Sequence, residues 1–147
     1  MAEDTDVANF LTGSRRVHEL KKIQLVGKVV SGRGEGKKFL ELKWAQKQVS
    51  DKLNFTPFLG TLNLRLEEHS KKQRRLLTKD SALGVCTSKG YCKGLLFKAA
   101  IAGITCGVVL PLVEGYPNDE LEVVAELNLR QQLGLHDDDS VEVNVFF

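Results

Sequence analysis

The most apolar part of the chain, residues 99–113, is interrupted in a way that limits what it can form. Gly103, Gly107 and Pro111 fall inside it, and glycine and proline are unfavourable in the interior of a helix. We therefore predict two buried β-strands in this region, joined by a tight turn at Ala102-Gly103. The expected strands cover residues 91–100 and 104–112.

Several other segments have the composition or the alternation of strands. In residues 61–66, leucines alternate with Thr61, Asn63 and Arg65, so the leucines would share one face of a strand and the polar side chains the other. The remaining predicted strands cover residues 23–31, 38–42, 121–125 and 141–147.

Two segments have helical signals instead. Ala45, Val49 and Leu53 recur every four residues with polar residues between them, which predicts an amphipathic helix. Asn128 is a good N-cap for a second, short helix that Gly134 would end. Many short strands with only two short helices are typical of a closed or nearly closed β-barrel.

Composition and charge narrow the class of protein. The chain has 147 residues and a formal net charge of +2, which fits one ordinary domain and is not the footprint of a nucleic-acid binder. We expect residues 1–21 to form a polar tail and residues 22–147 the folded domain. The N-terminus lacks the features of a signal peptide, so we expect a cytoplasmic monomer with no membrane partner.

Residues that often build metal or nucleophilic sites are poorly arranged for either. Cys86, Cys92 and Cys106 form no CxxC pair and are odd in number, so we interpret them as reduced, mostly structural thiols. The acidic run at 137–139 is interpreted as a polar turn before the last strand. The charged stretch at 67–80 is interpreted as a solvated loop in preference to a phosphate-binding patch.

A glycine-rich segment follows the first predicted strand. Its glycines would let backbone N–H groups turn toward an anion, and Lys37 and Lys38 could neutralise a phosphate. The GK[ST] ending of a P-loop is absent, and a strand is expected next, so the segment is neither a P-loop nor a dinucleotide-binding fingerprint. On this segment alone, a hairpin loop that needs positive φ is the alternative.

Two further segments carry groups that suit a phosphate ligand. Thr61 and Asn63 would project from the same side of a strand, and their oxygens are hard ligands of the kind Mg²⁺ prefers. Because both are neutral, a bound nucleotide would have to complete such a site. Arg130, in the short helix capped by Asn128, would add a fixed cation with forked donors. The alternatives are polar groups that face solvent and a capped helix with a surface arginine.

Taken together, these segments resemble the archaeal-type CTP-dependent riboflavin kinases. The similar stretches are, in order, VVSGRGEGKKF, FTPFLGTLNLRL and ELNLRQQLGL, and the resemblance runs from about residue 23 to the C-terminus. It implies a mainly β fold, a six-stranded cradle-loop β-barrel with short helices. It also implies transfer of the γ-phosphate of CTP to the 5′-hydroxyl of riboflavin, giving FMN and CDP, with Mg²⁺ as the cofactor.

The resemblance implies roles for individual residues. Thr61 and Asn63 match the residues that bind Mg²⁺. Glu122 matches a glutamate that binds the flavin, and its expected place near the flavin chain makes it our candidate catalytic residue. Glu114 stands where the family has a second flavin-binding residue, a threonine. The nucleotide-binding positions are Arg33, Gly34, Glu35, Gly36, Lys37, Lys38, Asn128, Leu129, Arg130 and Gln131.

The alternative function is a non-catalytic barrel. The stretch ELNLRQQLGLHDDDSVEV also resembles the helix-then-strand unit of swapped-hairpin DNA-binding regulators, although those proteins are shorter and lack the GTLN sequence. A degenerate kinase that binds flavin or nucleotide without turnover is a third hypothesis, suggested by Glu114. Incubation with riboflavin, Mg²⁺ and each nucleoside triphosphate separates these functions.

Overall fold

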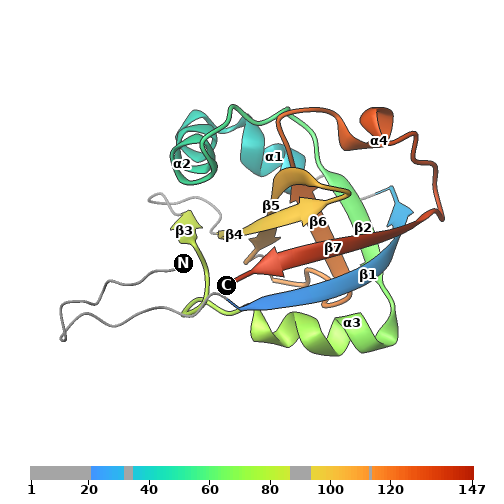
Figure 1. Ribbon diagram of the computed structural model, residues 1–147. Helices are drawn as coiled ribbons and strands as arrows, with labels where there is room; N and C mark the ends of the chain where they lie inside the picture. The colour runs from blue at the N-terminus through green and yellow to red at the C-terminus, as the bar shows by residue number, and fades with distance from the viewer. Residues whose placement is uncertain (1–20, 32–34, 87–93, 113) are drawn as a thin grey trace, which may run out of the picture.

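In the computed structural model, which describes residues 21–31, 35–86, 94–112 and 114–147, six antiparallel strands close into a β-barrel (Figure 1). The strands are β1 (Lys22–Val30), β2 (Leu62–Leu66), β4 (Gly94–Ile101), β5 (Ile104–Pro111), β6 (Glu120–Val124) and β7 (Ser140–Phe146). Hydrogen-bonded neighbours run β4-β5-β6-β2-β1-β7, and β7 pairs with β4 to close the ring. A short extra strand, β3 (Gly84–Cys86), extends the same edge of β4 that β7 uses. The prediction of a six-stranded, mainly β barrel is confirmed.

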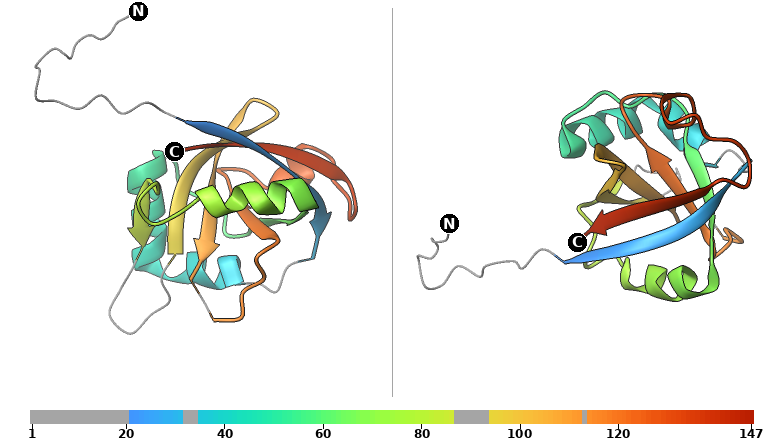
Figure 2. Two further views of the ribbon diagram at one scale, coloured as in Figure 1. Left: turned by 90° about the horizontal axis from the view of Figure 1, so that it is seen from below. Right: turned by 45° about the vertical axis from the view of Figure 1, so that its right-hand side comes forward.

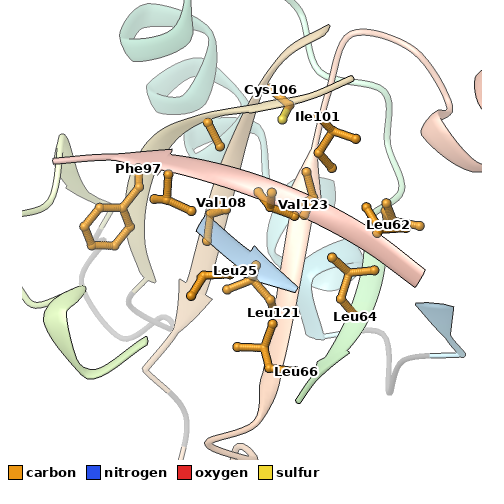
Figure 3. Close-up of a cluster of buried hydrophobic side chains, with 14 of the residues drawn as sticks. Leu25, Leu62, Leu64, Leu66, Phe97, Ile101, Cys106, Val108, Leu121 and Val123 are labelled. Carbon is orange, nitrogen blue, oxygen red and sulfur yellow. The ribbon is translucent and has the colours of Figure 1, made fainter. Parts of the chain in front are cut away.

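Alternation within the strands fills the barrel with apolar side chains. Leu62, Leu64 and Leu66 of β2 are all buried in the main core, as their spacing predicted. Figure 3 shows that residues from strands that do not pair with each other, such as Leu25 of β1 and Leu121 of β6, point into the same interior. Each such side chain contributes about 1.5–3 kcal/mol when it is fully buried.

A second core lies on the outer surface of the barrel, under two helices. These are α1 (Glu35–Glu41) and α2 (Lys43–Leu53). Ala45, Val49 and Leu53 of α2 are buried here, which confirms the predicted amphipathic helix. The outward-facing strand residues that they cover are Leu96, Val109 and Val124. Strand β6 is therefore buried on both faces.

The strand predicted at residues 38–42 is wrong, because this segment belongs to helix α1. Strand β1, the nearest possible partner, has no free edge, since it pairs with β2 on one side and β7 on the other. A helix instead lets Leu40 join the second core, where it is fully buried. The element that follows β1 in the described residues is therefore a helix, which begins at Glu35.

The solvated loop predicted at residues 67–80 is also wrong in part. The chain forms α3 (Glu68–Gln73) and the 3₁₀ helix η1 (Arg74–Leu76), on the side of the barrel opposite α1 and α2 (Figures 1 and 2). The contacts that hold these helices are polar. Ser70 Oγ accepts a 2.7 Å hydrogen bond from Val26 N, and Arg74 Nε donates to Glu120 O at 3.0 Å. Apolar periodicity gave no sign of them for this reason.

The predicted turns are confirmed where the structure describes them. Ala102 and Gly103 have φ values of 49° and 81°, and they join β4 to β5 as a two-residue hairpin loop requires. Asp138 has a φ of 73° in the turn before β7, and Asp139 Oδ2 accepts a 2.7 Å hydrogen bond from His136 N. The acidic run is thus a polar turn.

The one cysteine whose side chain is described behaves as a structural thiol. Cys106 is fully buried in the main core, and burial raises the pKa of its thiol to about 12. The thiol stays protonated at neutral pH, and a protonated thiol is a poor nucleophile. The side chains of Cys86 and Cys92 lie outside the described residues. In the described ranges, no helix has both the length and the apolar character that crossing a membrane needs.

Replacement of Gly27 by alanine should destabilise the barrel. A Cβ at this position would lie 2.9 Å from Arg65 O and 3.2 Å from Leu64 Cβ, so β1 and β2 would have to separate. We expect Gly27→Ala to lower the free energy of unfolding by roughly 1–3 kcal/mol in urea titrations. The neighbouring Lys28→Ala is the control, because Lys28 is exposed and its loss should change stability by no more than about 0.5 kcal/mol. Equal stability of Gly27→Ala and the parent would contradict the close approach of the strands.

Candidate functional site

The outer face of the β2–β6 pair carries the polar residues of the site. Asn63 lies directly opposite Glu122, and Arg65 lies opposite Glu120. Their neighbours along each strand, Leu64 and Leu121 among them, point into the main core. The alternation that builds the barrel interior therefore also sets these polar side chains on a common outer face.

Three side-chain oxygens meet where this face reaches the start of β2. Thr61 Oγ1 lies 2.9 Å from Glu122 Oε1 and 3.0 Å from Asn63 Oδ1. We call these three atoms the oxygen cluster. A hydroxyl has a single proton and can donate it to only one of the two acceptors at a time. The cluster thus has more acceptor oxygens than protons to share between them.

Two of the three residues of the oxygen cluster are buried, and Thr61 is partly buried. Glu122 is fully buried and Asn63 is 7% exposed, so the alternative that the polar groups of residues 61–66 face solvent is wrong for Asn63. Asn63 Nδ2 has no hydrogen-bond partner within the described part of the chain, which is unusual for a buried amide.

Tyr116, in the connection between β5 and β6, contacts the other oxygen of Glu122. Its hydroxyl donates a 2.6 Å hydrogen bond to Glu122 Oε2. Burial, followed by this hydrogen bond to the Glu122 carboxylate, raises the pKa of Tyr116 well above its ordinary value. The phenol therefore stays protonated and acts as the donor. Tyr116 was not among the predicted site residues, because a tyrosine in a connection between strands belongs to no periodic pattern.

The oxygen cluster has the chemistry of a site for a small divalent cation. Hydroxyl, amide and carboxylate oxygens are the ligands that Mg²⁺ takes. Glu122 supplies the negative charge that Thr61 and Asn63 lack. This contact was not predicted from the sequence, because the resemblance supplied Glu122 only as a flavin-binding residue and the pairing of β2 with β6 joins segments far apart in the chain. Within the described residues, no group of three or more His, Cys, Asp or Glu side chains could hold a metal.

A pocket of about 150 Å³ opens beside Thr61 and reaches helix α4 (Leu129–Gln132). Asn128 caps this helix as predicted, since its Oδ1 accepts from Gln131 N at 3.2 Å. Arg130 also lines the pocket, and its Nη2 lies 2.8 Å from Asp137 Oδ1. The pocket is lined by Phe58, Gly60, Thr61, Leu62, Val123, Ala125, Leu127, Asn128, Leu129 and Arg130.

The structure thus brings two of the three predicted constellations together. The predicted metal pair and the start of α4 share one pocket through Thr61, Asn128 and Arg130. Gln131 is exposed and does not line this pocket, and Glu114 is exposed as well.

The glycine segment is only partly described. Arg33 and Gly34 lie outside the described residues, and Glu35 and Gly36 are described only as backbone at the start of α1. Lys37 and Lys38 are exposed on α1 and do not line the pocket.

Comparison with known proteins identifies the family. A family model named CTP-dep_RFKase, with the description "Domain of unknown function DUF120", matches residues 29–145. The riboflavin kinase of Pyrobaculum arsenaticum is 40% identical over 146 residues, which cover 95% of this chain and 68% of that protein. The riboflavin kinase of Ignicoccus hospitalis is 40% identical over 130 residues, covering 86% of this chain and 73% of that protein.

A third relative has the same name. The riboflavin kinase of Saccharolobus solfataricus is 35% identical over 133 residues, covering 86% of this chain and 76% of that protein. The family model spans most of the barrel and both predicted constellations that meet at the pocket. The chain therefore belongs to the CTP-dependent riboflavin kinase family.

Proposed function

We propose that this chain is a CTP-dependent riboflavin kinase, which transfers the γ-phosphate of CTP to the 5′-hydroxyl of riboflavin and releases FMN and CDP. The observation that carries the proposal is the pocket that joins Thr61 of the oxygen cluster to Arg130 and Asn128. A cation site and a fixed positive charge in one pocket are the two features that a transferring phosphate requires. Membership of the family supports the choice of substrates.

Phosphoryl transfer depends on positioning and on neutralising charge more than on covalent chemistry. Arg130 presents a forked guanidinium that can bind two phosphate oxygens at once. The ion pair that now holds Arg130 joins side chains that are 40% and 59% exposed, so exchanging Asp137 for a phosphate costs little. The proposed nucleotide site also includes the glycine segment at residues 33–38, Leu129 and Gln131, which match the family positions.

The oxygen cluster is the proposed place of Mg²⁺. Thr61 Oγ1, Asn63 Oδ1 and Glu122 Oε1 would hold the ion, which would supply neutralisation of the phosphate oxygens when it is bound. Burial of Glu122 and Asn63 keeps water away from this side of the site. Charge interactions are stronger in such a place than in bulk solvent.

Riboflavin is proposed to approach from the side of Glu122 and Glu114. Glu122 can accept a hydrogen bond from the 5′-hydroxyl, and it is the candidate to take its proton. Glu114 is exposed and stands at the position where the family has threonine. An ionised carboxylate only accepts hydrogen bonds, whereas a threonine hydroxyl also donates. We therefore propose that Glu114 contacts a flavin hydroxyl rather than a flavin carbonyl.

The remaining parts of the proposal concern the whole molecule. We propose a cytoplasmic monomer in which residues 1–21 form a tail and residues 22–147 form the catalytic domain. The two alternative functions are a DNA-binding regulator and a degenerate kinase without turnover. Both predict that no FMN forms from riboflavin and any nucleoside triphosphate.

FMN formation should depend on the identity of the nucleotide. We expect CTP to support the conversion of riboflavin to FMN roughly tenfold or more faster than ATP, GTP or UTP, because discrimination of this size needs only a few base contacts. The measurement is chromatographic detection of FMN with each nucleotide in the presence of Mg²⁺. Equal rates with CTP and ATP would contradict the proposed preference for CTP, but they would still support riboflavin kinase activity. Binding of flavin and nucleotide without FMN from any triphosphate would indicate the degenerate kinase.

Loss of the Thr61 hydroxyl should weaken the use of Mg²⁺. Thr61→Val keeps the branched shape and removes one oxygen of the cluster, so we expect the Mg²⁺ concentration for half-maximal rate to rise roughly tenfold or more. Thermal stability should also fall, by about 1–3 kcal/mol, because the fully buried Glu122 loses a hydrogen-bond donor, so the Mg²⁺ requirement is measured at a temperature where the variant is folded. Thr105→Val is the matched control, since Thr105 is an exposed strand threonine away from the pocket. An unchanged Mg²⁺ requirement in Thr61→Val would contradict the assignment.

Removing Arg130 should weaken CTP binding without unfolding the protein. A hydrogen bond to a charged group contributes about 1.5–3 kcal/mol, so Arg130→Ala should lower CTP affinity about tenfold or more in calorimetric titrations. Asp137→Ala is the matched control, because it removes the same ion pair but keeps the cation. We expect that control to bind CTP as well as the parent or better. Equal losses in both variants would indicate that the ion pair, and not the charge of Arg130, supports binding.

A further inference from the structure

We propose that Tyr116 is a positioning residue that makes the oxygen cluster select Mg²⁺ over Ca²⁺, by holding Glu122 so that a single carboxylate oxygen faces Thr61 and Asn63. This inference rests on the proposed function of the oxygen cluster as the metal site. It adds a residue from outside strands β2 and β6, and it explains what the tyrosine hydroxyl does there.

The two oxygens of Glu122 have different partners. Oε2 accepts the 2.6 Å hydrogen bond from Tyr116, whereas Oε1 lies 2.9 Å from Thr61 Oγ1. An ionised carboxylate can only accept hydrogen bonds, so Tyr116 must be the donor. Because Glu122 is fully buried, its carboxylate cannot turn toward water to exchange these partners.

The local chain geometry delivers the tyrosine ring to this place. Gly115, the preceding residue, has a φ of 83°, which glycine adopts without strain. Tyr116 itself is only partly exposed. Arg74, whose charge acts on the phenol, is anchored to the backbone of β6 through Glu120 O, at 3.0 Å. Tyr116 thus follows a turn at Gly115, and it interacts electrostatically with the anchored cation of Arg74.

A fixed carboxylate has consequences for the choice of ion. Mg²⁺ requires near-ideal octahedral geometry with short bonds, and it commonly takes one oxygen from each carboxylate. Ca²⁺ accepts six to eight ligands at longer distances and readily binds both oxygens of a carboxylate. With Oε2 held by Tyr116, binding through both oxygens would require the short hydrogen bond to break. Glu122 therefore presents the single-oxygen ligand that suits Mg²⁺ and disfavours Ca²⁺.

The test is Tyr116→Phe, which keeps the ring and removes only the hydroxyl. MgCl₂ and CaCl₂ are titrated separately by calorimetry into the parent and the variant, each saturated with CDP. Loss of a partner that orients a metal ligand typically lowers affinity roughly 10–100-fold. We expect Mg²⁺ affinity to fall by about tenfold, while Ca²⁺ affinity stays the same or rises. The dissociation constant for Mg²⁺, divided by that for Ca²⁺, should therefore increase in the variant. In the same variant, Ca²⁺ should inhibit FMN formation at lower concentration.

Two further variants test whether the effect on metal binding is specific to Tyr116. Glu122→Gln removes the charge and should weaken both ions, whereas Thr105→Val should change neither. If Tyr116→Phe lowers the melting temperature while the ratio of the Mg²⁺ and Ca²⁺ dissociation constants stays as in the parent, the tyrosine is only structural. In that case the proposal is overturned. A change confined to the KM for riboflavin would also overturn it, because Glu122 would then face the flavin alone. A parent that binds Mg²⁺ selectively but forms no FMN would refute the proposed function while leaving the role of Tyr116 standing.

Discussion

The antiparallel register of β2 and β6 is the constraint on which the rest of the site depends. Asn63 is paired with Glu122, and this one alignment places a buried carboxylate against an amide oxygen on the outer face of the barrel. The same alignment turns Leu64 and Leu121 into the main core. Because side chains alternate along a strand, a slip of one residue would put leucines at the site and the carboxylate in the core. The apolar core therefore fixes the geometry of the polar site.

Sequence patterns predicted the parts of the molecule that depend on local chemistry. The alternation of residues 61–66, the hairpin at Ala102-Gly103 and the cap at Asn128 each follow from a few neighbouring residues, and the structure has all three. The patterns failed where distant partners decide. Residues 38–42 become helical because both edges of β1 are already paired, and α3 is held by the polar contacts of Ser70. Neither fact is visible in a short window of sequence.

The composition of the site was only partly predictable for the same reason. Thr61 and Asn63 are two residues apart, so their spacing indicates a shared face. Glu122 lies 2.9 Å from Thr61 but belongs to another strand, and Tyr116 belongs to a connection without periodicity. Their meeting depends on strand order and on the path of a loop. The resemblance supplied Glu122 as a flavin residue, whereas the structure adds its contact with the proposed metal pair.

A buried carboxylate such as Glu122 is poor evidence for stability, since removing a charge from water costs more than its hydrogen bonds return. The hydroxyls of Thr61 and Tyr116 each lie within hydrogen-bond distance of one of its oxygens, and such hydrogen bonds reduce that cost. The strand two residues further on carries Val124, which is buried under α2, so an apolar residue would fit the outer face of β6. We therefore attribute the carboxylate at position 122 to the proposed cation site rather than to a gain in stability. The two apolar cores stabilise the barrel without this carboxylate. On this proposal, the buried charge is explained by ligand binding.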